Sequence, residues 1–238
     1  MSIQFPKDAA PFIATSRNIL RSSGITITIG SDFEAYKKII ESERQVQKLG
    51  PPFDPKNHAL NASNGFWLIG RNEDGELIHT QAAKKVTLQG KTLAEHLRTH
   101  FKFFPPPLAE VDVQKSRFRA TPGAHKINGN VVYHGEVWMA PEKGRYRGVG
   151  LSTVLARSGL LEVMRRWSPD YMYGFMLRSV AFKGFAERMG YMHNEPGCLF
   201  WHLTGRDVPI EAFLTYLTKE DAQYLLDIPV EDIVTVAA

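Results

Sequence analysis

One stretch constrains the fold more than any other: an apolar segment, a glycine-containing turn and an amphipathic segment follow one another over residues 130–167. The segment NVVYHGEVWMAP predicts a strand, and GLSTVLARSGLLEVMRRW predicts a helix. Between them lies RYRGVG, residues 145–150, whose closely spaced glycines allow the backbone to approach a ligand. A strand, a glycine turn and a helix N-terminus in this order form an arrangement that binds phosphate groups.

The spacing of the glycines argues against two classes of nucleotide site. A Walker loop requires G-x-x-x-x-G-K-[ST], but the sixth residue counted from Gly144 is Val149, and no lysine follows. A dinucleotide-binding loop requires G-x-G-x-x-G, and Thr153 occupies the place of the third glycine after Gly148 and Gly150. A different phosphate ligand, or an ordinary turn, remains open at this point.

The rest of the chain alternates strands and helices. Residues 24–30 (GITITIG) predict a strand, and the next segment predicts a helix that begins at a capping box of Ser31 and Glu34 and ends at Gly50 and two prolines. The remaining predicted elements are a hairpin over 65–88, a helix capped by Thr92 and Glu95, strands at 171–176 and 197–203, and a helix over 179–191. This order predicts an α/β fold with a mixed sheet and helices on both faces.

Two segments are predicted as additions to one domain of residues 1–205. Residues 87–130 contain a helix and a long, irregular, basic connection. Residues 206–238 are predicted as a helical extension, because Asp207 and Thr218 each precede a short helical pattern.

Within the helix that follows the glycine turn, Gly159 is expected to lower the stability of the helix by about 1 kcal/mol relative to alanine.

The glycine turn matches the pattern [RQ]-x-x-G-x-[GA] through Arg145, Gly148 and Gly150. With the preceding strand and the following helix, the chain here resembles the GNAT (GCN5-related N-acetyltransferase) superfamily, whose members bind acetyl-CoA or longer acyl-CoA. The segment RSVAFKGFAERMGY resembles the family's downstream helix, and the resemblance spans roughly residues 24–203. It implies a mostly antiparallel sheet and an acyl-CoA-dependent N-acyltransferase that uses no metal.

The resemblance implies that the acyl-CoA pyrophosphate binds to the glycine turn and that the pantetheine arm lies along the preceding strand. The residues that it places at the cosubstrate are Trp138, Met139, Ala140, Arg145, Tyr146, Arg147, Gly148, Val149, Gly150, Leu151, Ser152, Ser179 and Lys183.

Transfer to an amine needs a base for the amine and an acid for the departing thiolate. Glu136, on the strand before the glycine turn, is the candidate base, since some family members use a carboxylate there; a structural ion pair with an arginine is the alternative. His134 would lie on the same side of an unbulged strand and is the second candidate; a packed, structural histidine is the alternative. The family's usual tyrosine acid aligns with Ala186, so either another group serves, such as Tyr191 or a water, or proximity alone carries the rate.

The predicted reaction transfers an acetyl group directly to a primary amine of a small molecule or peptide. One alternative is a long-chain N-acyl amino acid or acyl-signal synthase, with an apolar tunnel lined by Trp67, Phe101, Phe103, Phe104 and Trp138; another is a non-catalytic acyl-CoA-binding protein. The single cysteine, Cys198, is expected to be a buried residue rather than an acyl carrier.

The chain carries a net charge of +4, but its basic residues are scattered, which disfavours a nucleic-acid-binding surface. No membrane partner is expected, because no apolar run approaches the ~18 residues of a spanning helix. The lone cysteine and the absence of a secretion-signal pattern at the N-terminus predict a cytoplasmic protein. A homodimer through the predicted tail helices is a further expectation.

Overall fold

The computed structural model describes residues 9–44, 47–107, 110–141, 146, 150–229 and 232. These residues form an eight-stranded sheet in the order β1-β2-β3-β5-β6-β8-β7-β4, in which only β5 and β6 pair in parallel. The strands are β1 (Thr26–Gly30), β2 (Gly65–Arg71), β3 (Leu77–Val86), β4 (Val111–Phe118), β5 (Val131–Met139), β6 (Tyr171–Leu177), β7 (His193–Leu203) and β8 (Ile210–Thr218). The prediction of a mixed, mostly antiparallel sheet is confirmed.

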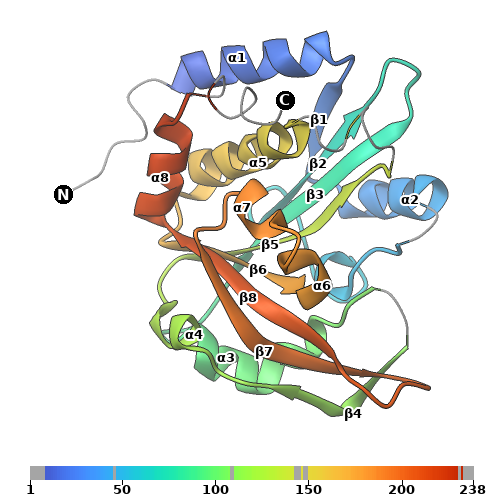
Figure 1. Ribbon diagram of the computed structural model, residues 1–238, viewed down its shortest axis with the longest axis vertical. Coiled ribbons are helices and arrows are strands. Elements are labelled where there is room, and N and C mark those ends of the chain that lie inside the picture. The colour runs from blue at the N-terminus through green and yellow to red at the C-terminus, as the bar shows by residue number, and fades with distance from the viewer. Residues whose placement is uncertain are drawn as a thin grey trace.

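Helices cover both faces of this sheet, as predicted (Figure 1). On one face lie α1 (Ala9–Ser22), α5 (Leu151–Trp167), α7 (Phe185–Arg188) and α8 (Lys219–Asp227). On the other face lie α2 (Phe33–Glu43), η1 (Pro51–Phe53), α3 (Leu93–His100), η2 (Phe101–Phe103) and α4 (Pro122–Lys126), while α6 (Arg178–Ala181) directly follows β6. No helix of the described residues combines the length and the apolar character needed to cross a membrane.

Each face of the sheet has its own hydrophobic core, and strand alternation assigns residues to them. Ala83 and Val132 point to the core beneath α5, whereas their neighbours Ala82 and Tyr133 point to the core beneath α2 and α3. All of these residues are buried, so the central strands read as continuous apolar runs in the sequence. We call the two sides the α5 face and the α2 face.

Helix α2 differs from the prediction at both ends. Its N-cap is Asp32, whose side chain accepts a hydrogen bond from the Ala35 N–H at 3.0 Å, rather than Ser31. The helix ends at Glu43 instead of continuing to Gly50. The Arg44 side chain donates to the carbonyls of Gln47 and Lys48, at 2.7 and 2.8 Å, and these bonds hold the following segment in a non-helical path.

The two predicted additions contain strands that the sequence patterns do not reveal. Residues 111–118, predicted as irregular, form the edge strand β4, which pairs with β7 alone. The helix predicted after Asp207 is wrong: residues 210–218 form β8, which lies between β6 and β7 in the sheet. The helix predicted after Thr218 is confirmed as α8, with a capping box of Thr218 and Asp221.

Two further differences concern helices. Helix α1, over residues 9–22, packs on the α5 face and is not among the predicted elements. The helix expected over 179–191 is divided into the single turns α6 and α7, because Gly184 adopts a left-handed conformation with φ of 67° between them. Both turns lie beside the end of β6, where the sheet opens.

Candidate active site

Strands β5 and β6 pair over three residues only and then part. The pairing joins Val131–Tyr133 to residues 171–173, and neither strand pairs with the other beyond this point. A cavity of about 460 Å³ occupies the opening, a size typical of a small-molecule site. Its lining residues come from both faces: Met176, Val180, Phe185, Met189 and Tyr191 from the α5 face, and Pro52, Phe104, Tyr133, Phe175 and Trp201 from the α2 face.

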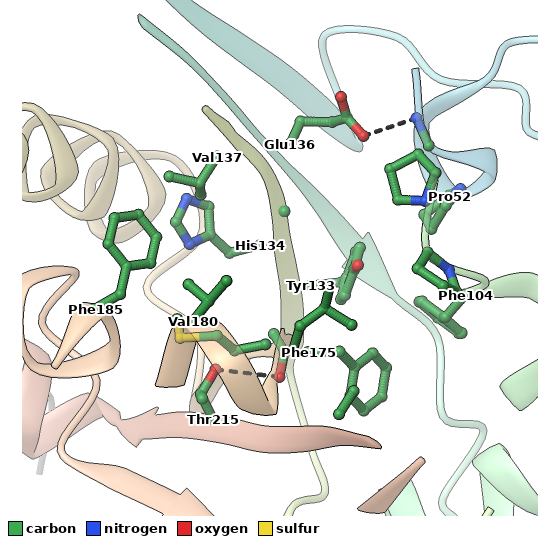
Figure 2. A pocket seen from close by; sticks show the side chains of 18 of the residues that line it. Pro52, Phe104, Tyr133, His134, Glu136, Val137, Phe175, Val180, Phe185 and Thr215 are labelled. Atoms are coloured by element: carbon green, nitrogen blue, oxygen red, sulfur yellow. Dashed lines mark hydrogen bonds between the residues drawn. The ribbon is translucent and has the colours of Figure 1, made fainter. Parts of the chain in front are cut away.

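A β-bulge in β5 sends the two candidate catalytic side chains to opposite faces. Gly135 pairs with Ala82 and Trp138 pairs with Thr80, so Glu136 and Val137 together stand opposite the single residue Gln81. Glu136 accordingly has a left-handed backbone, with φ of 57°. On an unbulged strand Glu136 would share a side with His134, but Figure 2 shows the two side chains on different sides of β5.

Glu136 is held in a buried ion pair on the α2 face. Its Oε2 lies 2.6 Å from a terminal nitrogen of Arg44, and the two side chains are 4% and 0% exposed. Its Oε1 accepts a hydrogen bond from the Gly50 N–H at 2.8 Å (Figure 2). Burial raises the pKa of Glu136, and the adjacent Arg44 guanidinium and the Gly50 hydrogen bond oppose that rise.

His134 belongs to a hydrogen-bonded chain of side chains on the α5 face. Its Nδ1 lies 2.8 Å from the Tyr191 hydroxyl, and its Nε2 lies 3.1 Å from Oε1 of Gln81. The Gln81 amide nitrogen in turn contacts the Leu155 carbonyl at 2.7 Å and Nε2 of His79 at 3.1 Å. Tyr191, His134, Gln81 and His79 are all buried.

The Leu155 carbonyl fixes the direction of every bond in this chain. A carbonyl only accepts, so the Gln81 amide nitrogen faces it and Gln81 Oε1 faces His134. Nε2 of His134 must then carry the proton, and its Nδ1 accepts from the Tyr191 hydroxyl. Burial lowers the pKa of His134 to about 4 and raises that of Tyr191, so both groups are neutral near pH 7.

Gly159 is required for the close packing of α5 on the sheet, although a glycine lowers helix propensity. A Cβ at this position of α5 would lie 2.1 Å from Oε1 of Gln81. The glycine therefore lets α5 approach the sheet closely enough for the Gln81 amide to reach the Leu155 carbonyl.

Helix α5 begins directly after Gly150, the last glycine of the predicted phosphate-binding turn. Gly150, the N-cap residue, has a left-handed backbone with φ of 76°. No side chain of the described residues caps this end of the helix. Leu151 is buried and Ser152 is half-buried. The first N–H groups of a helix have no partner within the helix, so this end can accept an anionic ligand.

The strand residues predicted at the cosubstrate occupy the end of β5. Trp138 and Met139 pair with Thr80 and His79 of β3, and the Ala140 N–H donates to the Ile78 carbonyl at 2.8 Å. The opposite edge of this part of β5, on the side of β6, faces the opening of the sheet.

The other predicted site residues are in varied positions. Tyr146 is buried in the core of the α5 face, and its hydroxyl accepts a hydrogen bond from Asn72 at 3.2 Å. Ser179 is exposed and lines the cavity, whereas the exposed Lys183 lies outside the cavity lining, in the turn between α6 and α7. The predicted residues Arg145, Arg147, Gly148 and Val149 lie outside the described residues.

The predicted apolar tunnel is largely absent from the cavity. Of the five aromatic residues proposed for it, only Phe104 is in the lining. Trp67 stacks on Tyr36, Phe101 stacks on Phe118, and Phe103 is 45% exposed. Cys198 is buried, which raises the pKa of its thiol to about 12 and agrees with a packing role.

Sequence reasoning missed three elements of this site. Gln81 and Arg44 carry no motif, and only the folded sheet brings them to His134 and Glu136. Pro105–Pro107, next to the predicted tunnel residue Phe104, form a wall of the cavity that no sequence motif indicates. Tyr191 is the exception, because its place after Gly190 in the sequence already indicates a possible acid.

Comparisons with known proteins give structural likeness at low sequence identity. Arabidopsis thaliana NAA60 in complex with acetyl-CoA is 15% identical, with 82% of this chain and 98% of that chain covered and a TM-score of 0.46. Spermidine N-acetyltransferase from Vibrio cholerae in complex with CoA and spermine is 9% identical, with 84% and 98% covered and a TM-score of 0.45.

An N-acetyltransferase from Staphylococcus aureus Mu50 is 8% identical, with 82% and 98% covered and a TM-score of 0.44. No family model and no curated protein matches the chain. All three TM-scores lie below 0.5, so they establish neither the activity nor the substrate of this chain.

Proposed function

We propose that this protein is an acyl-CoA-dependent N-acyltransferase of the GNAT superfamily that transfers an acetyl group directly to a primary amine. The observation that carries the proposal is the opening between β5 and β6, whose cavity reaches both faces of the sheet. Such an opening lets a donor on the α5 face meet an acceptor on the α2 face. Holding two reactants in one cavity supplies much of the rate enhancement of a direct transfer.

Acyl-CoA would bind on the α5 face. There the uncapped N-terminus of α5 provides N–H groups and a positive dipole end for the pyrophosphate. Beyond Tyr133, β5 no longer pairs with β6, and this edge would provide backbone groups for the amide groups of the pantetheine arm. The arm would then lead the thioester into the opening beside Tyr191 and His134, both of which line the cavity.

The buried pair of Tyr191 and His134 would carry the proton between the two substrates. As the amine attacks the thioester carbonyl, its proton passes to the Tyr191 oxygen, and the Tyr191 proton passes to Nδ1 of His134 over the 2.8 Å bond. Gln81 Oε1 stabilises the resulting imidazolium by accepting a hydrogen bond from its Nε2–H. When the C–S bond breaks, the proton returns by the same path to the thiolate, so no net proton is gained or lost.

We assign Glu136 a positioning role rather than that of the base. Its two oxygens already accept hydrogen bonds from Arg44 and Gly50, and the pair joins the bulge in β5 to the segment after α2. This attachment holds the bulge, and the bulge directs the Glu136 side chain to the face opposite His134.

A transfer assay with acetyl-CoA and a panel of primary amines tests the proposed function, with mass spectrometry of the product and release of free CoA as readouts. Transfer to at least one amine, with a sequential kinetic pattern, is expected. Binding of acyl-CoA without transfer to any amine would overturn the proposal and favour a non-catalytic acyl-CoA-binding protein. A strong preference for long-chain donors over acetyl-CoA would favour the acyl-signal synthase instead.

Tyr191→Phe tests the proton path. Removing one acid–base group typically lowers kcat by about 10²–10⁴-fold, so kcat should fall by at least 10²-fold while the KM for acetyl-CoA changes little. Tyr224→Phe, at a 60% exposed position on α8, is the matched control and should retain full activity. Unchanged kcat in Tyr191→Phe would remove Tyr191 from the mechanism.

A further inference from the structure

The half of the cavity on the α2 face has a composition that restricts the acceptor; this inference rests on the proposed function. Its wall is formed by Phe104 and Pro105–Pro107 from the segment after α3, Pro52 from η1, and the rings of Tyr133 and Phe175 (Figure 2). The three rings pack edge to face or tilted, with centroids 4.8–6.1 Å apart. Prolines and aromatic rings present rigid, apolar surfaces that fit a flat apolar group.

This half of the cavity also lacks unpaired charge. Among the described residues that line the cavity there is no lysine, arginine or aspartate, and the one carboxylate belongs to Glu136. That carboxylate is neutralised by Arg44 at 2.6 Å, and the Arg44 side chain is fully buried behind it. Tyr133, in the same wall, stays neutral because burial raises the pKa of its hydroxyl.

A charged acceptor would lose hydration in this cavity without gaining a partner. Each ammonium group of a polyamine needs a carboxylate, and the carboxylate of an amino acid needs a cation; the described lining offers neither in an unpaired form. Moving an uncompensated charge out of water is costly. An amine that enters in its neutral, nucleophilic form, attached to an apolar body, avoids this cost.

We infer that the acceptor is a primary monoamine with an uncharged, flat apolar or aromatic body. The amine would face Tyr191 through the opening. The apolar body would pack against the edge-to-face pair of Phe104 and Phe175, whose ring centroids lie 5.4 Å apart, and against Pro105–Pro107. The insertion of residues 87–130 thereby determines acceptor specificity, because Phe104–Pro107 belong to it.

Initial rates with saturating acetyl-CoA and four amines test this inference. The probes are 2-phenylethylamine, phenylalanine amide, phenylalanine and spermidine. Phenylalanine and its amide differ in the carboxylate charge and in the pKa of the amine, so kcat/KM is compared per neutral amine, and that ratio measures the penalty for the charge. We expect kcat/KM for 2-phenylethylamine to exceed that for phenylalanine and for spermidine by at least 100-fold, with the amide above the acid by at least 10-fold.

The outcomes separate this inference from the proposed function. Efficient transfer to spermidine or phenylalanine would overturn the inference and leave the acyltransferase activity standing. Transfer to none of the probes or the wider amine panel, with acetyl-CoA bound in a thermal-shift assay, would overturn both.

Phe104→Leu and Phe104→Ala locate the acceptor. Both variants should lower kcat/KM for 2-phenylethylamine, the alanine variant by at least 30-fold, through KM for the amine and without a change in the acetyl-CoA thermal shift. The leucine variant keeps a large apolar side chain, so it is expected to fold even if the alanine variant does not. Phe103→Ala, at the neighbouring 45% exposed position, is the control and should behave like the unmodified protein. Equal effects of Phe103→Ala and Phe104→Ala would overturn the assignment of this wall.

Discussion

Replacing Arg44 with leucine tests the idea that a buried ion pair fixes the bulge of β5. The substitution removes the guanidinium, with its bonds to Glu136 at 2.6 Å, to the Thr80 hydroxyl at 3.2 Å and to two carbonyls of the following segment. Glu136 is left buried, with the Gly50 N–H as its remaining hydrogen-bond partner among the described residues.

Leaving one partner of a buried ion pair uncompensated costs about 3–5 kcal/mol. For a chain of this length each kcal/mol lowers Tm by about 2–4 °C, so Arg44→Leu should lower Tm by roughly 10 °C. Arg71→Leu is the matched control, since Arg71 also pairs with a glutamate, Glu43, at 2.6 Å, but both side chains are about one third exposed. An exposed pair contributes at most about 1 kcal/mol, so the control should lose only a few degrees.

The Tm deficit of Arg44→Leu should also depend on pH. Without Arg44, burial dominates and holds the pKa of Glu136 in the folded variant above its value in the unfolded chain. A carboxyl group with a raised folded pKa destabilises the fold once pH rises through that pKa, because it must then ionise in a buried position. The deficit relative to the unmodified protein should therefore be larger at pH 8 than at pH 5.

Differential scanning fluorimetry across this pH range measures the effect, and Arg44→Leu/Glu136→Gln completes the cycle. The double variant lacks the buried charge, so at pH 8 it should be more stable than Arg44→Leu, and the pH dependence of the deficit should disappear. Equal losses in Arg44→Leu and Arg71→Leu, or a deficit that does not vary with pH, would refute the reasoning.

Two further predictions concern the α5 face. Gly159→Ala should destabilise the fold by about 1–3 kcal/mol in urea denaturation, because the added Cβ would lie 2.1 Å from Gln81 Oε1; stabilisation, the result expected from helix propensity alone, would show that Gln81 can move aside. Burial lowers the pKa of His134 to about 4 and that of His79 to about 3, so both are neutral in the fold, and the stability that they contribute above their ordinary pKa near 6.5 is lost as pH falls toward 4. The urea midpoint should fall between pH 7 and pH 4.5, and less so in His134→Gln; identical profiles for the two proteins would contradict this prediction.

The sequence predicts the central strands well because each of them has a recognisable pattern within its own few residues. β2, β3, β5 and β6 carry apolar runs bounded by turn residues, and α5 follows from its apolar spacing. β8 escapes prediction because Asp207 and the residues after it also satisfy a helical pattern. Only pairing with β6 on one side and β7 on the other decides in favour of the strand.

The candidate site shows the same division between local and long-range information. His134 and Glu136 stand on a recognisable strand, but the bulge that separates them is fixed by Arg44, which is 92 residues from Glu136 in the sequence. Likewise Gln81 lies 53 residues from His134, and nothing in its own neighbourhood indicates a role in orienting that ring. Such pairs of residues meet only in the folded sheet, and no periodic pattern in the sequence indicates them.

The parting of β5 and β6 lets residues from both faces of the sheet line one cavity. Half-exposed Gln47 and Pro105–Pro107 stand at the end on the α2 face, and exposed Ser179 with half-exposed Phe185 stands at the end on the α5 face. Molecules that arrive from opposite faces of a sheet do not obstruct one another. For a donor and an acceptor that bind from opposite faces, as proposed above, the strands themselves therefore impose no order of binding or release.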